Sequence, residues 1–293
     1  MYILQQFINA LTTGGVYALI AVGFAIIYNI LRFSNWSYGA TITVSSYAGY
    51  YVASQLHFSF LPSLLVAMST GGVLAVLIEL VAFRRIRKQK GPLIYFFVTS
   101  VSVSTGVQFL VLATIGGYFY NWPQIIPGEA LHIGSLTVST MNVLMGGACL
   151  MALLVLNFVL FRTRMGMAVR AAACDLGVAA LMGVNIDQVI SFIFFVSGAM
   201  AGLVGTLVGI AYTTYPQLGL ESMIKGFVAA IIGGLGSISG AVLGSMLLAL
   251  VETAVITSPL GASATPVVTF VLLLILLFVR PTGILGKSGS EKA

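Results

Sequence analysis

A basic stretch separates two long apolar runs at residues 84–90, where the sequence reads Arg84-Arg85-Ile86-Arg87-Lys88-Gln89-Lys90. The apolar runs on either side, 60–83 and 93–116, are each long enough for a membrane-spanning helix, which needs about 20 residues. An excess of Lys and Arg marks the cytoplasmic side of a membrane protein. The stretch therefore predicts two spanning helices joined by a cytoplasmic loop.

The same pattern extends over the whole chain. Twelve of its thirteen Lys and Arg residues fall into four such gaps. The chain is 59% hydrophobic and only 7% charged, against about 25% charged residues in a soluble domain, so it cannot form a water-facing surface. The basic residues do not indicate nucleic-acid binding, because they are strung between apolar runs. The other three gaps hold Arg32; Arg162, Arg164 and Arg170; and Arg280, Lys287 and Lys292.

The apolar runs predict an all-α, polytopic membrane helix bundle of eight or nine segments, forming one transmembrane domain over residues 1–293. The run 222–256 is broken at 233–240, which we call the Gly-Ser stretch. We expect two limbs that leave and re-enter on the same side, because the first limb reaches only about 20 Å into a core of about 30 Å. The runs are 5–31, 37–55, 60–83, 93–116, 139–161, 187–212, 222–256 and 265–279.

The basic gaps also set the orientation. With 84–92 and 162–186 in the cytoplasm, the N-terminus lies outside and the C-terminus inside. The loop 117–138 is then external, and its aromatic residues suit an interfacial belt. Glu79 lies close to the inner surface, where we expect its side chain to snorkel. The aromatic residues of the loop are Tyr118, Tyr120 and Trp122.

Glycines four residues apart recur in the second half of the chain. This spacing lets helix backbones approach closely, and we interpret it as tight packing rather than ligand contact. The glycines are Gly198 and Gly202, Gly205 and Gly209, and Gly236, Gly240 and Gly244.

Two ionisable residues lie deep in the run 222–256, and such residues at membrane depth are candidates for function. Lys225 precedes Ser237 by 12 residues and Glu252 follows it by 15, so antiparallel limbs would bring them to similar depth. We expect an intramembrane ion pair, because pairing offsets part of the insertion cost of about 2.5–3.5 kcal/mol per charge. The alternative is a Lys225 that snorkels to the outer headgroups beside Glu221.

Three groups of neutral residues are candidates for a substrate pathway. They are the connection at 32–39, which we call the join, the hydroxyl-rich part of the fourth run, and the Gly-Ser stretch. Glycines let backbone polar groups lie at membrane depth, where a cavity or protein must cover them. The hydroxyls could equally serve helix packing. The predicted pathway residues are Asn35, Tyr38, Gly39, Thr99, Ser100, Ser102, Gly234, Gly236 and Ser237.

No catalytic pair, nucleophile elbow or metal-ligand spacing is present in the sequence, so we expect no enzyme activity, cofactor or metal. Cys149 lies in an apolar run and Cys174 in a cytoplasmic loop, which argues against a disulfide. Any energy source must therefore come from a partner or an ion gradient.

Five stretches resemble, in order and over nearly the whole chain, the Liv-type permeases of branched-chain amino acid ABC importers. Tyr38 and Cys174 depart from the family, which usually has His and an acidic residue there. The stretches are NWSYG at 35–39, GMAVRAAACD at 166–175, AALMGV at 179–184, AAIIGGLGSISGA at 229–241 and RPTGILG at 280–286.

The resemblance implies a multi-pass subunit of the bacterial cytoplasmic (inner) membrane, in contact with membrane lipid. It would import a small amino acid-like solute, with branched-chain amino acids as the expected cargo. Its implied partners are a second permease subunit, two cytosolic ATP-binding subunits and an extracytoplasmic solute-binding protein. Docking is expected at 162–186, the coupling segment, which is long for a helix connection of usually 2–8 residues. A helix held by anionic lipid is the alternative. The coupling residues are Arg170, Asp175, Ala179 and Gly183.

Other functions stay open at this point. One is an ion-coupled secondary transporter that uses the broken limbs and the Lys225–Glu252 pair. Another is an ABC permease for urea, amides or a different small solute. The last is a channel or a structural membrane protein.

Overall fold

The computed structural model describes residues 2–123, 131–133, 136–259 and 261–286. Lys287 and Lys292 lie outside the described residues. The first half contains α1 (Tyr2–Leu31), α2 (Ser37–Ser54), α3 (Phe60–Ile78), the π-helical turn η1 (Glu79–Phe83), α4 (Arg84–Lys88) and α5 (Leu93–Ile115). The second half contains β1 (Leu131–Ile133), β2 (Leu136–Val138), α6 (Thr140–Arg162), α7 (Arg164–Cys174), α8 (Leu176–Leu181), α9 (Ile186–Ala211), α10 (Leu218–Gly233), α11 (Ile238–Thr257), the 3₁₀ turn η2 (Ala262–Ala264) and α12 (Thr265–Val279).

Two helices form the centre of the bundle. α1 packs against α6, α9, α10 and α11, and α9 packs against α2 and α3. Most of α1 and α9 is buried inside the protein, whereas α5, α6 and α12 expose most of their apolar side chains. Helices that are apolar all round occur in protein cores and in membranes, and the exposed apolar surface here indicates lipid. The chain is therefore a polytopic helical membrane protein.

Seven helices within the described residues are long and apolar enough to cross a membrane. α2 and α10, which the sequence predicted as further segments, are not among them. α10 has 16 residues and reaches about 24 Å, whereas α11 has 20 and reaches about 30 Å. The helical spans are Gln5–Leu31, Phe60–Lys88, Leu93–Ile115, Thr140–Arg162, Ile186–Ala211, Ile238–Thr257 and Ala262–Val279.

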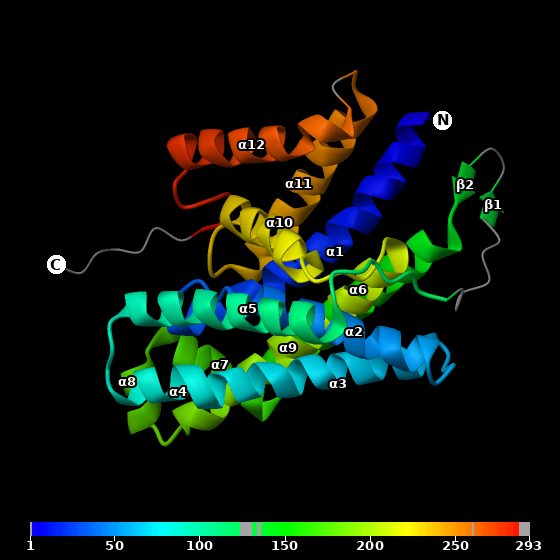
Figure 1. The fold of residues 1–293 in the computed structure, drawn as a ribbon. Coiled ribbons are helices and arrows are strands. Elements are labelled where there is room, and N and C mark those ends of the chain that lie inside the picture. The colour runs from blue at the N-terminus through cyan, green and yellow to red at the C-terminus, as the bar shows by residue number, and fades with distance from the viewer. Residues whose placement is uncertain (1, 124–130, 134–135, 260, 287–293) are drawn as a thin grey trace.

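The bundle has two distinct ends (Figure 1). One end carries α4 and α8, at the left of the view, and we call it the basic end. The other carries the start of α1 and the strands β1 and β2, at the right, and we call it the hairpin end. The short antiparallel β1–β2 ladder pairs Leu131 with Val138, and the other named elements of the described residues are helical, as expected for an all-α bundle.

The loop after α5, where the sequence predicted aromatic residues suited to an interfacial belt, packs against the ends of α2 and α9. Tyr120 pairs through its backbone with Thr214, and the indole Nε1 of Trp122 donates to Thr214 Oγ1 at 2.9 Å. Both rings also contact Tyr50 of α2. Only Tyr118 is strongly exposed, because the other two rings cover the ends of α2 and α9.

The glycine spacing of α9 serves packing, as predicted. A Cβ added to Gly205 would lie 2.5 Å from the carbonyl oxygen of Ile42 in α2, and one added to Gly202 would overlap the backbone of Ala67 in α3. Side chains at these positions would force the helices apart. Small residues therefore bring three backbones together around α9.

Candidate functional site

The join holds the start of α2 against α5. Asn35 Oδ1 accepts from Ser37 N at 3.2 Å and from Ser37 Oγ at 2.6 Å, which satisfies donors at the start of the helix. The backbone N–H of Trp36 donates to Ser100 Oγ at 3.2 Å. The ring of Phe33, also in the join, packs on Phe96 of α5. Two predicted pathway residues, Asn35 and Ser100, are thus brought together, and their polar atoms hold the join in place.

The other pathway residues near the join point in different directions. The ring of Tyr38 is buried against Gly23 of α1, and its hydroxyl has no hydrogen-bond partner within the described residues. Gly39 lies against the backbone of Gly219 in α10. Ser102 is exposed on α5 and donates back to Val98 O at 3.0 Å, and Thr99 is half-buried. The hydroxyls of α5 therefore face both the bundle and its outside.

The Gly-Ser stretch lies at a different place from the join. Gly236 has a φ of +89°, and its nearest neighbour is Asn29 near the end of α1. Ser237 Oγ accepts from Gly240 N at 3.1 Å and caps α11. Gly234 packs against residues 282–286, where Ile284 N donates to Ile232 O at 2.9 Å. The nine predicted residues therefore form two groups, because the length of α10 carries the stretch away from the join.

The coupling segment forms two short helices at the basic end. Arg170 of α7 donates to Leu160 O at the end of α6, and its guanidinium lies 5.1 Å from the ring centre of Phe161. Asp175 Oδ1 accepts from Gly177 N at 2.7 Å and from Val178 N at 2.9 Å, which caps α8. Both charged residues thus stabilise the local structure of the coupling segment.

The tip of α8 carries the most exposed large apolar side chains of this segment. Ala179 is buried, but Leu181 is 88% exposed and Met182 is 80% exposed. Gly183 has a φ of +85° and nothing within 4 Å of an added Cβ, so the turn and not a packed neighbour requires glycine. The sequence analysis did not identify Leu181 and Met182 as an exposed surface, because apolar residues in a short helix usually face inward.

Lys225 and Glu252 lie side by side, as the antiparallel limbs allow. Lys225 Nζ is 3.4 Å from Glu252 Oε2 and donates to Tyr17 OH at 2.8 Å. Tyr17 OH donates to Glu252 Oε2 at 2.6 Å, and Thr269 Oγ1 donates to Glu252 Oε1 at 3.2 Å. The Glu252 side chain is 5% exposed and that of Lys225 is 43% exposed. Glu221 accepts from Tyr215 OH at 2.6 Å.

The exposed side of Lys225 faces a cavity of about 510 Å³ near the hairpin end, which we call the Lys225 cavity. It lies between α1, α6, the end of α9 and the start of α10. Its polar groups include Glu221, Ser222 and Tyr215, and burial raises the pKa of Tyr215, so its phenol stays protonated and donates to Glu221. Its apolar lining includes Val16, Ile20, Met145, Val208 and Leu218.

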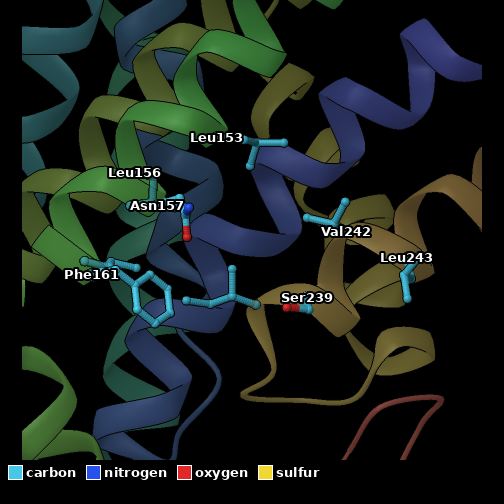
Figure 2. Close-up of a pocket in the computed structure, with 9 residues that line it drawn as sticks. Leu153, Leu156, Asn157, Phe161, Ser239, Val242 and Leu243 are labelled. Atoms are coloured by element: carbon cyan, nitrogen blue, oxygen red, sulfur yellow. The ribbon is translucent and has the colours of Figure 1, made fainter.

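A second hollow is an apolar groove of about 300 Å³ between α6 and α11. Figure 2 shows Leu153, Leu156 and Asn157 on one side and Ser239, Val242 and Leu243 on the other. Among the described residues that line it, the polar ones are Asn157 and Ser239. Apolar grooves on the side of a membrane bundle suit lipid tails, which are as apolar as leucine.

A family model described as the permease component of the branched-chain amino acid transport system matches residues 6–279. The chain belongs to this family.

Individual permease proteins are similar to the chain over most or all of its length. The high-affinity branched-chain amino acid transport system permease protein LivH of Escherichia coli strain K12 is 34% identical, covering 100% of this chain and 98% of LivH. BraD of Pseudomonas aeruginosa, with the same description, is 32% identical and covers 99% and 97%. The autoinducer 2 import system permease protein LsrC of Yersinia pseudotuberculosis is 25% identical and covers 94% and 77%. No solved structure matches the chain.

One charged cluster of this family member was missed by sequence reasoning. Glu79 does not snorkel, since its side chain is fully buried in the π-helical turn. Arg87 Nη2 donates to Glu79 Oε1 at 2.9 Å and to Asp187 Oδ1 at 2.7 Å. Ser191 Oγ donates to Glu79 Oε2 at 2.9 Å, and Arg84 Nη2 donates to Ser191 Oγ at 3.1 Å. This cluster ties the end of α3 to the start of α9, which directly follows the coupling segment.

Proposed function

We propose that the chain is the membrane permease subunit of an ABC importer that moves branched-chain amino acids inward. The observation that carries this proposal is the family match over residues 6–279, together with relatives such as LivH that align along both chains. The family is one of transport permeases rather than of enzymes. The fold supports the proposal, because it places an exposed helical tip at the basic end and a cavity near the hairpin end.

In this proposal the chain spans a bacterial inner membrane as a single domain, with its N-terminus outside. The basic end lies in the cytoplasm, as Lys and Arg residues favour. The short α10 and the following α11 form the broken, re-entrant pair, and α2 is a further segment shielded from lipid by its neighbours. A cysteine introduced at Lys88 should not react with an impermeant reagent added to intact cells, whereas one at Ser59 should.

The coupling contact is proposed at α8, with a cytosolic ATP-binding subunit as the occupant. Arg170 and Asp175 shape α7 and α8, Ala179 holds α8 against the protein, and Gly183 ends it. Leu181 and Met182 then project from the basic end, where a partner's cleft would bury them. Burying a Leu or Met side chain contributes about 1.5–3 kcal/mol. A second permease subunit and an extracytoplasmic binding protein complete the proposed assembly.

The substrate pathway is proposed to start at the Lys225 cavity and to pass the join. Tyr38, Gly39 and Ser100 fix the position of the join against α1, α10 and α5. The exposed hydroxyl face of α5, with Ser102, and the half-buried Thr99 would line the route. Gly234, Gly236 and Ser237 would form its inner end, because they lie close to the basic end of α1. Weak neutral contacts along the route would let the cargo leave.

Uptake of radiolabelled leucine tests the function. The chain, its second permease and its ATPase pair are reconstituted in proteoliposomes loaded with ATP, and leucine is added outside with the binding protein. Uptake should require ATP and both ATPase subunits. Leu181→Asp should abolish ATPase co-purification, whereas Leu56→Asp, an exposed apolar residue between α2 and α3, should not.

The same assay separates the main alternative. A secondary transporter is favoured only by the buried Glu252, held by Tyr17 and Thr269. Uptake that persists without the ATPase pair and collapses with a proton or sodium ionophore would establish that function and refute the ABC importer. Uptake of urea but not of leucine would correct the proposed cargo.

A further inference from the structure

We propose that the Lys225 cavity binds the zwitterionic backbone of an amino acid, with Lys225 receiving the carboxylate and Glu221 the ammonium group. This inference rests on the proposed function and adds a binding site to it. A pocket of about 510 Å³ falls within the usual range for small-molecule sites, about 300–1,000 Å³. Such sites combine an apolar lining with a few polar groups, as this cavity does.

Lys225 has a donor left for a ligand. An ammonium group carries three N–H donors. Two are directed at Tyr17 OH, at 2.8 Å, and at Glu252 Oε2, at 3.4 Å. These contacts fix Nζ at the cavity wall, while 43% of the side chain stays exposed there. The third donor can therefore reach a carboxylate in the cavity, to which charge-assisted bonds are stronger than neutral ones.

Glu221 offers the complementary charge one helical turn earlier on α10. Residues four apart on a helix have Cβ atoms about 5–6 Å from each other, so both charges face the same cavity. Tyr215 OH donates to Glu221 Oε2 at 2.6 Å and orients the carboxylate. An ionised carboxylate accepts about four hydrogen bonds, which leaves acceptors for a ligand ammonium group.

The two charges are spaced for one amino acid. The ammonium and carboxylate groups of an amino acid are attached to the same carbon, so both can bond to groups a helical turn apart. The side chain of the ligand would then lie against the apolar lining of the cavity. That lining comes from α1, α6, α9 and α10 and includes Val16, Ile20, Met145, Val208 and Leu218. This arrangement favours an aliphatic amino acid.

Cysteine protection in the intact complex tests the site without relying on transport. Ser222 lines the cavity next to Glu221, so Ser222→Cys in a Cys174→Ser background reports its occupancy. Reaction with an impermeant maleimide is followed with and without leucine. Leucine should slow labelling several-fold. Leucinamide, which lacks the carboxylate, and 4-methylpentanoate, which lacks the ammonium group, should not. Ser59→Cys, outside the cavity, should label at the same rate throughout.

Charge-removing variants identify the two contacts. Glu221→Gln should abolish protection by leucine, measured as the ratio of the labelling rates with and without leucine in the same variant. Lys225→Gln should do the same, and the double variant Lys225→Gln/Glu252→Gln avoids leaving Glu252 unpaired if the single variant does not fold. Equal protection by leucine and leucinamide, or full protection in Glu221→Gln, would overturn the proposal.

The two proposals can fail separately. ATP-driven leucine uptake without any protection of Ser222→Cys would refute this site and leave the importer function intact. Protection by leucine without ATP-driven uptake would support the site and refute the importer function.

Discussion

Gly198 of α9 and Gly71 of α3 face each other so closely that a Cβ added to either would overlap the carbonyl oxygen of the other. The two backbones are therefore in direct contact at the centre of the bundle. Small residues allow such approach in membranes, where van der Waals packing drives helix association. This contact positions α9, whose first turn follows the coupling segment and whose last turn borders the Lys225 cavity.

Gly198→Ala should destabilise the protein by about 1–3 kcal/mol, because the methyl group overpacks the α3–α9 contact. Alanine's better helix propensity, about 1 kcal/mol, offsets part of this loss. Gly106→Ala in α5 is the matched control, since its Cβ would meet nothing within 4 Å. Thermal melting of the detergent-solubilised protein measures both. Equal melting temperatures would show that α3 and α9 can separate freely.

Glu79→Gln should lower stability strongly, because it removes the charge shared by Arg84 and Arg87. Breaking a buried ion pair by removing one partner costs about 3–5 kcal/mol. Asp187→Asn is the comparison, since Asp187 binds the same Arg87 with a side chain 40% exposed, where about 1 kcal/mol is expected. Expression and melting temperature report the difference. A smaller loss for Glu79→Gln than for Asp187→Asn would contradict the burial argument.

Gly183→Val should weaken ATPase co-purification more than Gly183→Asn. The φ of +85° is strained for a side chain and most strained for a β-branched one, whereas Asn tolerates it better. Holding a side-chain-bearing residue in this left-handed conformation costs about 1–2 kcal/mol. Relief of this strain would distort the turn that follows Leu181 and Met182. Pull-down of the ATPase subunit is the measurement. If both variants bind the ATPase equally well, the turn geometry does not matter for docking.

Tyr17→Phe should cost more stability than Thr269→Val. The phenol of Tyr17 both donates to Glu252 and accepts from Lys225, and its loss leaves a buried carboxylate short of a donor, at about 1–3 kcal/mol. Thr269 makes one side-chain hydrogen bond within the described residues, at 3.2 Å, and about 1 kcal/mol is expected. Combining Tyr17→Phe with Glu252→Gln should give less than the summed loss. Strict additivity would argue that the two groups do not interact.

The class of the protein and much of its architecture could be predicted from the amino-acid sequence alone. The length of an apolar run matches the thickness of a membrane, and basic gaps such as 84–90 match its charge asymmetry. Both features can be read from a short stretch of sequence. The glycine spacing of α9 indicated close packing for the same reason, because a helix repeats its faces at a fixed interval. The ordered motifs, from 35–39 to 280–286, were enough to indicate the permease family.

The contacts between distant residues could not be predicted from the sequence and are known from the folded structure. It separated the Gly-Ser stretch from the join, buried Glu79 between Arg84 and Arg87, and showed that Asp175 caps its own helix. It also brought Tyr17 of α1 between Lys225 and Glu252, beside a cavity that no motif marks. Such contacts join segments far apart in the chain, and they depend on how whole helices cross and pack. Sequence periodicity determines which residues share a face of a helix, but not which other helix packs against that face.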